Sequence, residues 1–352
     1  MRADGGRSIG LGHVLRCVAL AAGLKELGFD TILAIKADDF RLEDLDVPCG
    51  IHVITIPNGR SYEDDSLLTL DSAIDNEVDW IVVDQCHSSI PSCDDFGHYL
   101  TSLREECSTA CIAGSEGIDF DVDLIVSPYY REVYPPLPAK STSEYLLGPD
   151  FFVFREEFRQ VATLKREIAE FARRVLVTIG GADEFSVTGK LARSLARCGR
   201  NNLTITFIVG PAYPKNIEEH IRQAMLGSGV EFEIVSRCRN MATEMLKADI
   251  AVIGDGLTKY EGALLGIPCI TLSRPNSDES INAEFAQIGS SLHLGDATLI
   301  DEEHLGREIL SVCGNRNRRL QMARRGKDLV DGGGISRIAE AMNRRNLRRV
   351  GP

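Results

Sequence analysis

The feature that most constrains this chain is an alternation of short apolar runs with segments whose apolar residues recur at helical spacing. Each run has the length and composition of a buried β-strand, and several of them end in Gly, Pro or Asp. Two neighbouring parallel strands need a crossover connection, which is usually a helix. The alternation therefore predicts an α/β protein in which helices cover both faces of a parallel sheet.

The expected elements follow this alternation in both halves of the chain. In the first half we expect strands at Thr31–Ile35, Ile51–Ile56, Trp80–Asp84, Ala110–Ala113 and Leu124–Val126, and helices at His13–Leu27 and Asp95–Glu106. In the second half we expect strands at Arg174–Ile179, Leu203–Val209, Glu231–Val235, Ile250–Ile253 and Cys269–Leu272. The helices expected there include Ile217–Leu226, Thr258–Leu265, Glu279–Ile288, Glu302–Val312, Asn315–Leu329 and Ser336–Leu347.

A proline-rich stretch divides the chain of 352 residues. Ser127–Phe158 carries five of its 13 prolines, and this density is typical of a non-helical connection. We therefore expect two Rossmann-like domains, residues 1–155 and residues 156–352, which agrees with the usual size of a domain. Two such domains are expected to face each other across a cleft, with the glycine-rich turns that follow their strands directed into it.

Composition excludes several classes of protein. The net charge is −13, which argues against nucleic-acid binding, because such proteins need a basic face to neutralise phosphates. It has no apolar run near ~18 residues and no apolar leader at its start, so we expect neither membrane insertion nor secretion. The 10 cysteines include no Cys-x-x-Cys pair, which favours thiols in a reducing cytoplasm over a zinc site. We expect no metal ion and no cofactor.

The first motif that carries chemistry surrounds His13. Gly5, Gly6, Gly10 and Gly12 precede an expected helix, and glycines let backbone amides approach a ligand closely. The N-terminus of a helix favours an anion and disfavours an imidazolium, which helps to keep a neutral imidazole available as a base. Two alternatives remain open from the residues alone. His13 is either a catalytic base or a capping or core histidine on a tight turn.

Glycines also follow strands of the second half. Gly180 and Gly181 come directly after the strand that begins at Arg174, and Gly256 lies in the loop after the strand that ends at Ile253. Loops of this kind form a backbone cradle for a phosphate group. The alternative for each of them is an ordinary tight turn between a strand and a helix.

Polar residues continue this pattern into the helices that follow. Thr258 lies where a helix opens, a position that suits a diphosphate. Glu261 is one turn into that helix, where it either accepts hydrogen bonds from a ribose diol or satisfies the helix dipole. Asn282 belongs to the next strand-to-helix junction, which borders the same cleft or is a solvated helix cap.

Taken in order, these motifs resemble one family. The segments that carry the resemblance are RADGGRSIGLGHVLRCVALA, GGAD, GDGLTKYEGALLGIP, INAEFAQIGSSLHLG and LVDGGGISRIAEAM. They are similar to the UDP-sugar hydrolases of the pseudaminic acid pathway, which act on UDP-2,4-diacetamido-2,4,6-trideoxy-beta-L-altropyranose and are grouped with SpsG-like spore-coat polysaccharide proteins. The first segment is highly specific to that family, whereas the third is shared with the wider GT-B superfamily, including MurG-type transferases.

The resemblance implies a GT-B fold in which the C-terminal domain holds most of the UDP. It also implies a metal-independent hydrolysis at the sugar C1, with inversion and release of UDP. His13 matches the catalytic histidine that activates water, and Glu261 matches a ribose-binding glutamate. The further residues expected to bind substrate are Asp4, Gly10, Gly12, Arg16, Gly180, Gly181, Gly256, Thr258 and Asn282.

The chemistry of the substrate agrees with this hypothesis. UDP is a good leaving group, so the protein has to position a water molecule, deprotonate it and stabilise the departing diphosphate. The chain departs from the family pattern at Cys86, Ala113, Leu257 and Glu279, positions that would face the sugar or the phosphates. The alternatives are a GT-B glycosyltransferase that uses a UDP-sugar donor and a non-catalytic relative that binds nucleotide sugars.

Overall fold

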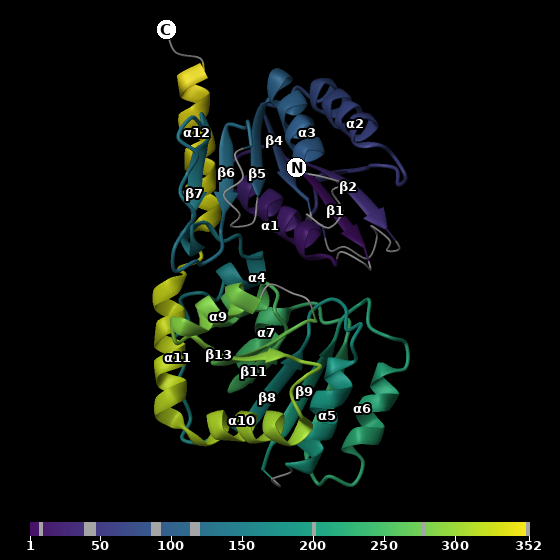
Figure 1. Cartoon of the computed structure of the whole chain (residues 1–352), viewed down its shortest axis with the longest axis vertical. Coiled ribbons are helices and arrows are strands. Elements are labelled where there is room, and N and C mark those ends of the chain that lie inside the picture. The colour runs from purple at the N-terminus through teal and green to yellow at the C-terminus, as the bar shows by residue number, and fades with distance from the viewer. Residues whose placement is uncertain are drawn as a thin grey trace. The chain divides into compact units, whose positions relative to one another are not determined.

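The chain is described here by a computed structural model that covers residues 1–6, 10–38, 47–85, 93–112, 120–198, 202–275 and 279–349. Its contacts divide the chain into two compact units. Unit 1 comprises Met1–Glu156 together with Gly332–Pro352, and unit 2 comprises Glu157–Asp331. Each unit contains a parallel sheet flanked by helices, which confirms the α/β class that the alternation predicts (Figure 1).

The described part of unit 1 contains a sheet in the order β3-β2-β1-β4-β5-β6-β7, with parallel pairing throughout. Its strands are β1 (Arg2–Gly6), β2 (Ile32–Asp38), β3 (His52–Thr55), β4 (Trp80–Asp84), β5 (Ser108–Ile112), β6 (Leu124–Ser127) and β7 (Glu144–Leu147). The strand order reverses at β1 and β4, because β2 and β3 lie to one side and β5 to β7 to the other. The carboxyl ends of β1 and β4 therefore form a switch point, where open α/β sheets bind ligands.

Helices cover both faces of this sheet. The helices of unit 1 are α1 (Gly12–Glu26), α2 (Tyr62–Asp75), α3 (Cys93–Glu106) and α12 (Gly334–Arg349); η3 (Pro149–Phe151) and α4 (Glu156–Arg159) are short turns near its boundary. Trp80 and Val82 of β4 pack with α1 and α12, whereas Ile81 and Val83 pack with α3. The side chains of β4 thus alternate between the two faces of the sheet and pack against helices on both.

The helix α12 returns the chain to unit 1. We expected it to belong with residues 156–352, but its Ile338 and Met342 join the core of the first sheet. Arg344 pairs with Glu144 of β7 at 3.0 Å, and the Trp80 Nε1 donates a hydrogen bond to Asn346 Oδ1 at 2.7 Å. The apolar residues of a terminal helix do not indicate which sheet the helix covers. The position of α12 in unit 1 corrects the expected domain limits (Figure 1).

The described part of unit 2 repeats the same topology in the order β10-β9-β8-β11-β12-β13. Its strands are β8 (Arg174–Thr178), β9 (Thr204–Val209), β10 (Glu231–Ser236), β11 (Ile250–Ile253), β12 (Cys269–Ser273) and β13 (Ser291–Asp296). Its helices are α5 (Val187–Arg197), α6 (Ile217–Met225), α7 (Met241–Lys247), α8 (Thr258–Leu265), α9 (Glu279–Gln287), α10 (Glu302–Gly314) and α11 (Arg316–Leu329). Here the order reverses at β8 and β11, so their carboxyl ends form a second switch point.

An apolar core packs helices against the sheet of unit 2. Leu191 of α5, Ile221 of α6 and Ile309 of α10 pack with strand residues such as Val175 and Phe207. The helix α8 packs against α11. None of the described helices in either unit is long and apolar enough to cross a membrane.

The structure contains elements that the apolar patterns do not predict, namely β1, β7, β13, α2, α4 and α7. The clearest case is β1, because the sequence predicts a glycine loop from Arg2 onward. Arg2–Gly6 instead lies in the middle of the sheet, in register with Ala34–Asp38 of β2. Its buried charge is satisfied by Asp65 of α2, so the strand needs no apolar run. The strand β7 likewise lies inside Ser127–Phe158, which was expected to be a connection without regular structure.

Candidate functional site

Two side chains meet at the switch point of unit 1. Asp84 is the last residue of β4 and is fully buried, and His13 is the second residue of α1, which follows β1. The Nδ1 atom of His13 lies 2.7 Å from Asp84 Oδ1. Because a carboxylate only accepts hydrogen bonds, we assign the proton to Nδ1, and Nε2 then carries a lone pair. The His13 side chain is 24% exposed, so a small molecule can reach the ring.

Arg16 holds the same carboxylate from the next turn of α1. Its Nε donates to Asp84 Oδ2 and its Nη2 to Asp84 Oδ1, both at 2.6 Å, and its Nη1 donates to the hydroxyl of Tyr129. Burial alone would raise the pKa of Asp84, but the charge and hydrogen bonds of Arg16, with the contact to His13, lower that pKa below its usual value. Asp84 is therefore a fixed carboxylate that orients the imidazole.

Asp4 belongs to a second buried ion cluster, on β1. Arg2 is fully buried and donates to both carboxylate oxygens of Asp65, at 2.9 and 2.6 Å. Its Nη1 also lies 2.5 Å from Asp4 Oδ1. Asp4, which we expected to bind substrate, is thus paired with Arg2 within unit 1. Its carboxylate offsets the free-energy cost of burying the guanidinium.

The two glycines expected at this site have different local roles. Gly10 has φ +78 and exchanges backbone hydrogen bonds with Gly6, at 2.8 and 3.1 Å, which holds Gly10 beside the end of β1. A positive φ of this size favours glycine. Gly12 begins α1, directly before His13, and a Cβ there would meet nothing within 4 Å.

The glycine loops after β8 and β11 approach each other at the switch point of unit 2. A Cβ on Gly254 would lie 2.9 Å from the carbonyl oxygen of Ile179, so this position tolerates no side chain. Gly180, with φ +101, Gly181 and Gly256 have open space where a Cβ would be. These three expected residues therefore leave room for a ligand to approach the backbone.

The helix α8 begins at this edge of the sheet with Thr258. The N-cap residue, Leu257, has no side chain that could accept a hydrogen bond from the first turn, and the amide of Tyr260 donates to the Leu257 carbonyl oxygen at 3.0 Å. The amides of Thr258 and Lys259 remain to serve an external acceptor. Glu261 lies in the same turn and is only 7% exposed. The helix α5 differs, because Asp183 of the GGAD segment accepts from two of its first amides at 2.8 Å. Asp183 is thus a capping residue.

A buried lysine lies between Thr258 and Glu261. Lys259 is 4% exposed, and its Nζ donates to Asn282 Oδ1 at 2.6 Å and to the carbonyl oxygen of Asp255 at 3.4 Å. Burial lowers the pKa of Lys259 to about 8, an effect that Asp255 partly opposes. Asn282, expected to bind substrate, is 2% exposed and is held by this lysine.

The polar chain continues from Asn282 to β13. The Nδ2 atom of Asn282 donates to Ser273 Oγ at 3.2 Å. The Ser273 Oγ lies 3.5 Å from His293 Nε2, and His293 Nδ1 lies 3.0 Å from Thr271 Oγ1. Burial lowers the pKa of His293. Hydrogen-bonding groups therefore connect the first turns of α8 and α9 with the ends of β12 and β13.

Motif reasoning misses three residues of these sites. Asp84 ends the apolar run WIVVD, and an acid directly after a buried strand is a signal for a site residue. Tyr129 lies two residues after the end of β6, another buried strand. Lys259 stands inside the segment GDGLTKYEG, but a lysine in the first turn of a helix is ordinarily solvated. Two of the departures from the family pattern, Cys86 and Ala113, lie outside the described residues.

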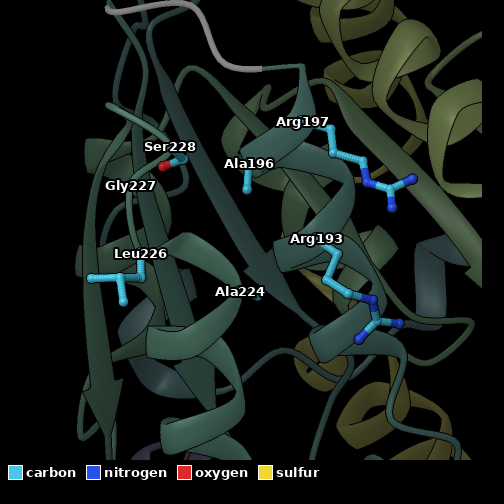
Figure 2. Close-up of a pocket in the computed structure, with 7 residues that line it drawn as sticks. All are labelled: Arg193, Ala196, Arg197, Ala224, Leu226, Gly227 and Ser228. Carbon is cyan, nitrogen blue, oxygen red and sulfur yellow. The ribbon is translucent and has the colours of Figure 1, made fainter.

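A shallow hollow of about 220 Å³ lies elsewhere on unit 2, against α5 and the loop after α6 (Figure 2). It is lined by Arg193, Ala196, Arg197, Ala224, Leu226, Gly227 and Ser228. Both arginines pair with Glu302, at 2.7 and 3.6 Å. The motif residues are not part of this lining, so the hollow adds nothing to the candidate site.

No protein-family model matches the chain. Over 344 residues the chain is 24% identical to the spore coat polysaccharide biosynthesis protein SpsG of Bacillus subtilis, and the match covers 96% of this chain and 95% of that protein. An uncharacterised protein of Methanocaldococcus jannaschii is 22% identical over 319 residues, which cover 86% of this chain and 61% of that protein. The resemblance to SpsG that the motifs indicate is therefore confirmed.

Solved structures with low sequence identity share the fold. MurG of Acinetobacter baumannii has a TM-score of 0.65 at 14% identity, covering 97% of this chain and 99% of its own. The MnaA protein of S. aureus in complex with UDP has a TM-score of 0.63 at 12% identity, covering 100% and 98%. The UDP-GlcNAc 2-epimerase of Neisseria meningitidis, bound to UDP-GlcNAc, has a TM-score of 0.61 at 12% identity, covering 98% and 100%. The chain thus has the GT-B fold expected from its motifs and is similar to SpsG along nearly its whole length.

Proposed function

We propose that this protein is a UDP-sugar hydrolase, which releases UDP from C1 of a diacetamido-trideoxy sugar during the synthesis of a nonulosonic acid or a surface polysaccharide. The observation that carries the proposal is the hydrogen bond between His13 and Asp84, with Arg16 on both oxygens of the carboxylate. An imidazole held in one tautomer by a buried carboxylate is the arrangement by which enzymes activate a hydroxyl group. Here the activated molecule is water.

The reaction that this geometry serves is a single displacement. The water oxygen attacks C1 while one of its protons passes to His13 Nε2. The bond between C1 and the diphosphate oxygen breaks, and UDP leaves with the electron pair. The configuration at C1 inverts because attack and departure take place on opposite faces. Asp84 stabilises the imidazolium that forms, and Arg16 keeps Asp84 ionised.

In this proposal unit 2 supplies the nucleotide-binding groups. The first-turn amides of α8 and the open loop at Gly256 bind the diphosphate, and Glu261 accepts hydrogen bonds from the ribose hydroxyls. Gly180 and Gly181 let the backbone of the neighbouring loop approach the same group. Stabilising the departing diphosphate by fixed amides lowers the barrier without a strong general acid.

The comparisons support the substrate class. SpsG is named for the synthesis of spore-coat polysaccharide, and the solved structures of MnaA and of the Neisseria epimerase hold UDP and UDP-GlcNAc. The segment GDGLTKYEGALLGIP, which resembles MurG-type transferases, favours a second candidate, a glycosyltransferase with a UDP-sugar donor.

The deciding experiment incubates the purified protein with a panel of UDP-sugars, with and without carbohydrate acceptors. Phosphorus NMR follows the release of UDP, and proton NMR reads the anomer first formed. We expect release without an acceptor, with inversion, and no effect of EDTA. Release only with an acceptor would establish the transferase. Conversion to an isomer still attached to UDP, or binding without turnover, would also refute the hydrolase.

A further inference from the structure

Lys259 joins a loop and a helix at the edge of unit 2 where the carboxyl ends of its strands lie. Its Nζ donates to the carbonyl oxygen of Asp255, in the loop after β11, and to the Oδ1 of Asn282, on α9, the helix after β12. The strands β11 and β12 are parallel neighbours, so both contacts lie at the same edge of the sheet. One ammonium group therefore connects the loop after β11 with α9.

The contact with Asp255 also sets the direction of an amide. In a trans peptide the C=O and the next N–H point in opposite directions. Because the Asp255 carbonyl is turned towards Lys259, the N–H of Gly256 is turned away from it. A Cβ on Gly256 would meet nothing within 4 Å, so this amide belongs to a residue with open space around it. Lys259 thus contacts the loop on the side opposite to the Gly256 amide and leaves that amide available to a ligand.

The positive charge of Lys259 is not matched by an acid. Within the described part of the chain, no carboxylate lies within ion-pair distance of its Nζ; the carboxylate of Asp255 instead pairs with Arg274 at 3.2 Å. Its other near neighbours are the rings of Tyr260 and Phe285, with centroids 5.8 and 5.6 Å from Nζ. An amide, a carbonyl and two rings leave a buried cation with a net attraction for an anion.

We propose that Lys259 is a positioning residue whose buried ammonium charge strengthens the binding of the diphosphate of a nucleotide at the loop between β11 and α8. This inference rests on the proposed binding of UDP by unit 2. Lys259 does not replace the α8 amides as a ligand of the phosphate. It orients the Gly256 amide, holds the loop against Asn282 and adds positive potential behind both.

If Lys259 acted only by connecting the loop after β11 with α9, the affinity for UDP would not depend on the charge of the ammonium group. A role for that charge predicts that the affinity changes with pH. Burial lowers the pKa of Lys259 to about 8, so its charge is present at pH 7 and largely lost at pH 9. A bound anion favours the charged form, so binding and protonation are linked. The charged fraction falls from about 0.9 at pH 7 to about 0.1 at pH 9. If the neutral lysine supports UDP binding about tenfold less well than the charged one, the affinity for UDP should fall about fivefold over this range.

Other titratable groups near Lys259 include the imidazole of His293 and three carboxyl groups. The pKa of His293 is lowered by burial, so this ring is neutral throughout the range. Glu279 and Asp255 also face His293. Glu261 lies on the same helix as Lys259. The second ionisation of a phosphate monoester, near ~6, is already about nine-tenths complete at pH 7, and its completion would strengthen rather than weaken binding as the pH rises.

The experiment measures UDP affinity by calorimetry at pH 7, 8 and 9 for the wild type, Lys259→Met and Lys259→Arg. The matched control is Lys247→Met, which removes an exposed lysine that pairs with Glu244 on α7. We expect Lys259→Met to bind UDP about tenfold more weakly at pH 7 and to show no loss between pH 7 and pH 9. We expect Lys259→Arg to keep its pH 7 affinity at pH 9, and Lys247→Met to follow the wild type.

The outcomes separate this inference from the function on which it rests. A wild-type protein that does not bind UDP at any pH refutes the nucleotide site itself. A wild-type protein whose UDP affinity is the same at pH 7 and pH 9 overturns the role of Lys259 while leaving the site standing. The wild-type profile, with carbon NMR of labelled lysine side chains in the presence and absence of UDP, decides the question even where Lys259→Met fails to fold. An upward shift of the Lys259 titration on UDP binding supports the inference, and an unshifted titration contradicts it.

Discussion

The switch points of the two units use charge in different ways. In unit 1 the buried cation Arg16 is matched by a carboxylate, Asp84, with two hydrogen bonds at 2.6 Å. In unit 2 the buried cation Lys259 contacts a carbonyl and an amide oxygen, and its pKa is lowered to about 8 by burial. The guanidinium is permanently charged and held in place, whereas the charge of the ammonium group depends on pH and on what binds nearby.

This difference shows how one topology serves two kinds of chemistry. The cluster of unit 1 follows β1 and β4, the two strands at which its strand order reverses. The cluster of unit 2 follows β11, one of the two strands at the corresponding reversal, and its neighbour β12. A paired, rigid network suits the orientation of a base, the role that we propose for His13, because nothing in the network has to change charge. An unmatched cation suits an anionic ligand, because the ligand supplies the missing charge. The fold provides the place, and the residues decide the chemistry.

The most severe way to break the comparison is to remove the carboxylate of unit 1. Asp84→Ala leaves the buried guanidinium of Arg16 without its partner, so we expect the free energy of unfolding to fall by about 3–5 kcal/mol. Urea denaturation measures this, with Asp79→Ala, an exposed acid just before β4, expected to change it by less than ~0.5 kcal/mol. Equal stability of the two variants would show that Arg16 does not depend on Asp84.

The second test concerns the base that this network orients. His13→Asn should lower turnover per folded molecule by at least ~10²-fold, the usual contribution of a positioned base, and leave the affinity for UDP nearly unchanged. His52→Asn, at an exposed position of β3, is the control. A capping histidine would instead reduce thermal stability and leave the rate per folded molecule intact, and that result would remove His13 from the mechanism.

The third test uses the stability of the protein to examine the cation of unit 2. An unfolded lysine keeps its proton to about pH 10.4, whereas folded Lys259 loses it near pH 8. Between these values the unfolded state binds more protons, so stability rises with pH. From pH 8 to pH 10 the unfolding free energy of the wild type should rise by about 2 kcal/mol relative to Lys259→Met. Parallel curves for the two proteins would mean that this lysine titrates normally.

The smallest expected effect concerns the ribose. Glu261→Ala removes up to two charge-assisted hydrogen bonds, each with a contribution of roughly 1.5–3 kcal/mol before compensation. The affinity for UDP should fall at least ~10-fold, which corresponds to ~1.4 kcal/mol. Glu219→Ala, at an exposed position of α6, should bind UDP as the wild type does. An unchanged dissociation constant for Glu261→Ala would refute the placement of the ribose.

Much of the fold is visible in the sequence because buried parallel strands are nearly continuous apolar runs. Trp80–Asp84 and Ile250–Ile253 are strands with the same bounds as expected. The central strand Arg2–Gly6 is invisible to this rule, since its burial depends on an ion pair with Asp65, a residue far along the chain. Short polar elements such as α7 are missed for a related reason, as their place is set by neighbours rather than by their own pattern.

The candidate site shows the same limit. Glycines and a histidine before a helix are a local signal, so His13, Gly180 and Gly256 can be predicted from the motifs. The residue that orients His13 is separated from it by 71 positions, and nothing in either segment states that they meet. The contact exists because β1 and β4 are neighbours in the sheet.

By itself, the sequence determined the α/β class, the presence of two Rossmann-like regions and the loops that carry the motifs, because periodicity and turn chemistry are local properties. Only the tertiary structure decided that α12 completes unit 1, that Asp84 accepts from His13 and Arg16, and that Lys259 is buried against Asn282. Those facts depend on which strands are neighbours and on the charges that burial brings together. Pairing and burial are properties of the whole chain, so no local pattern contains them.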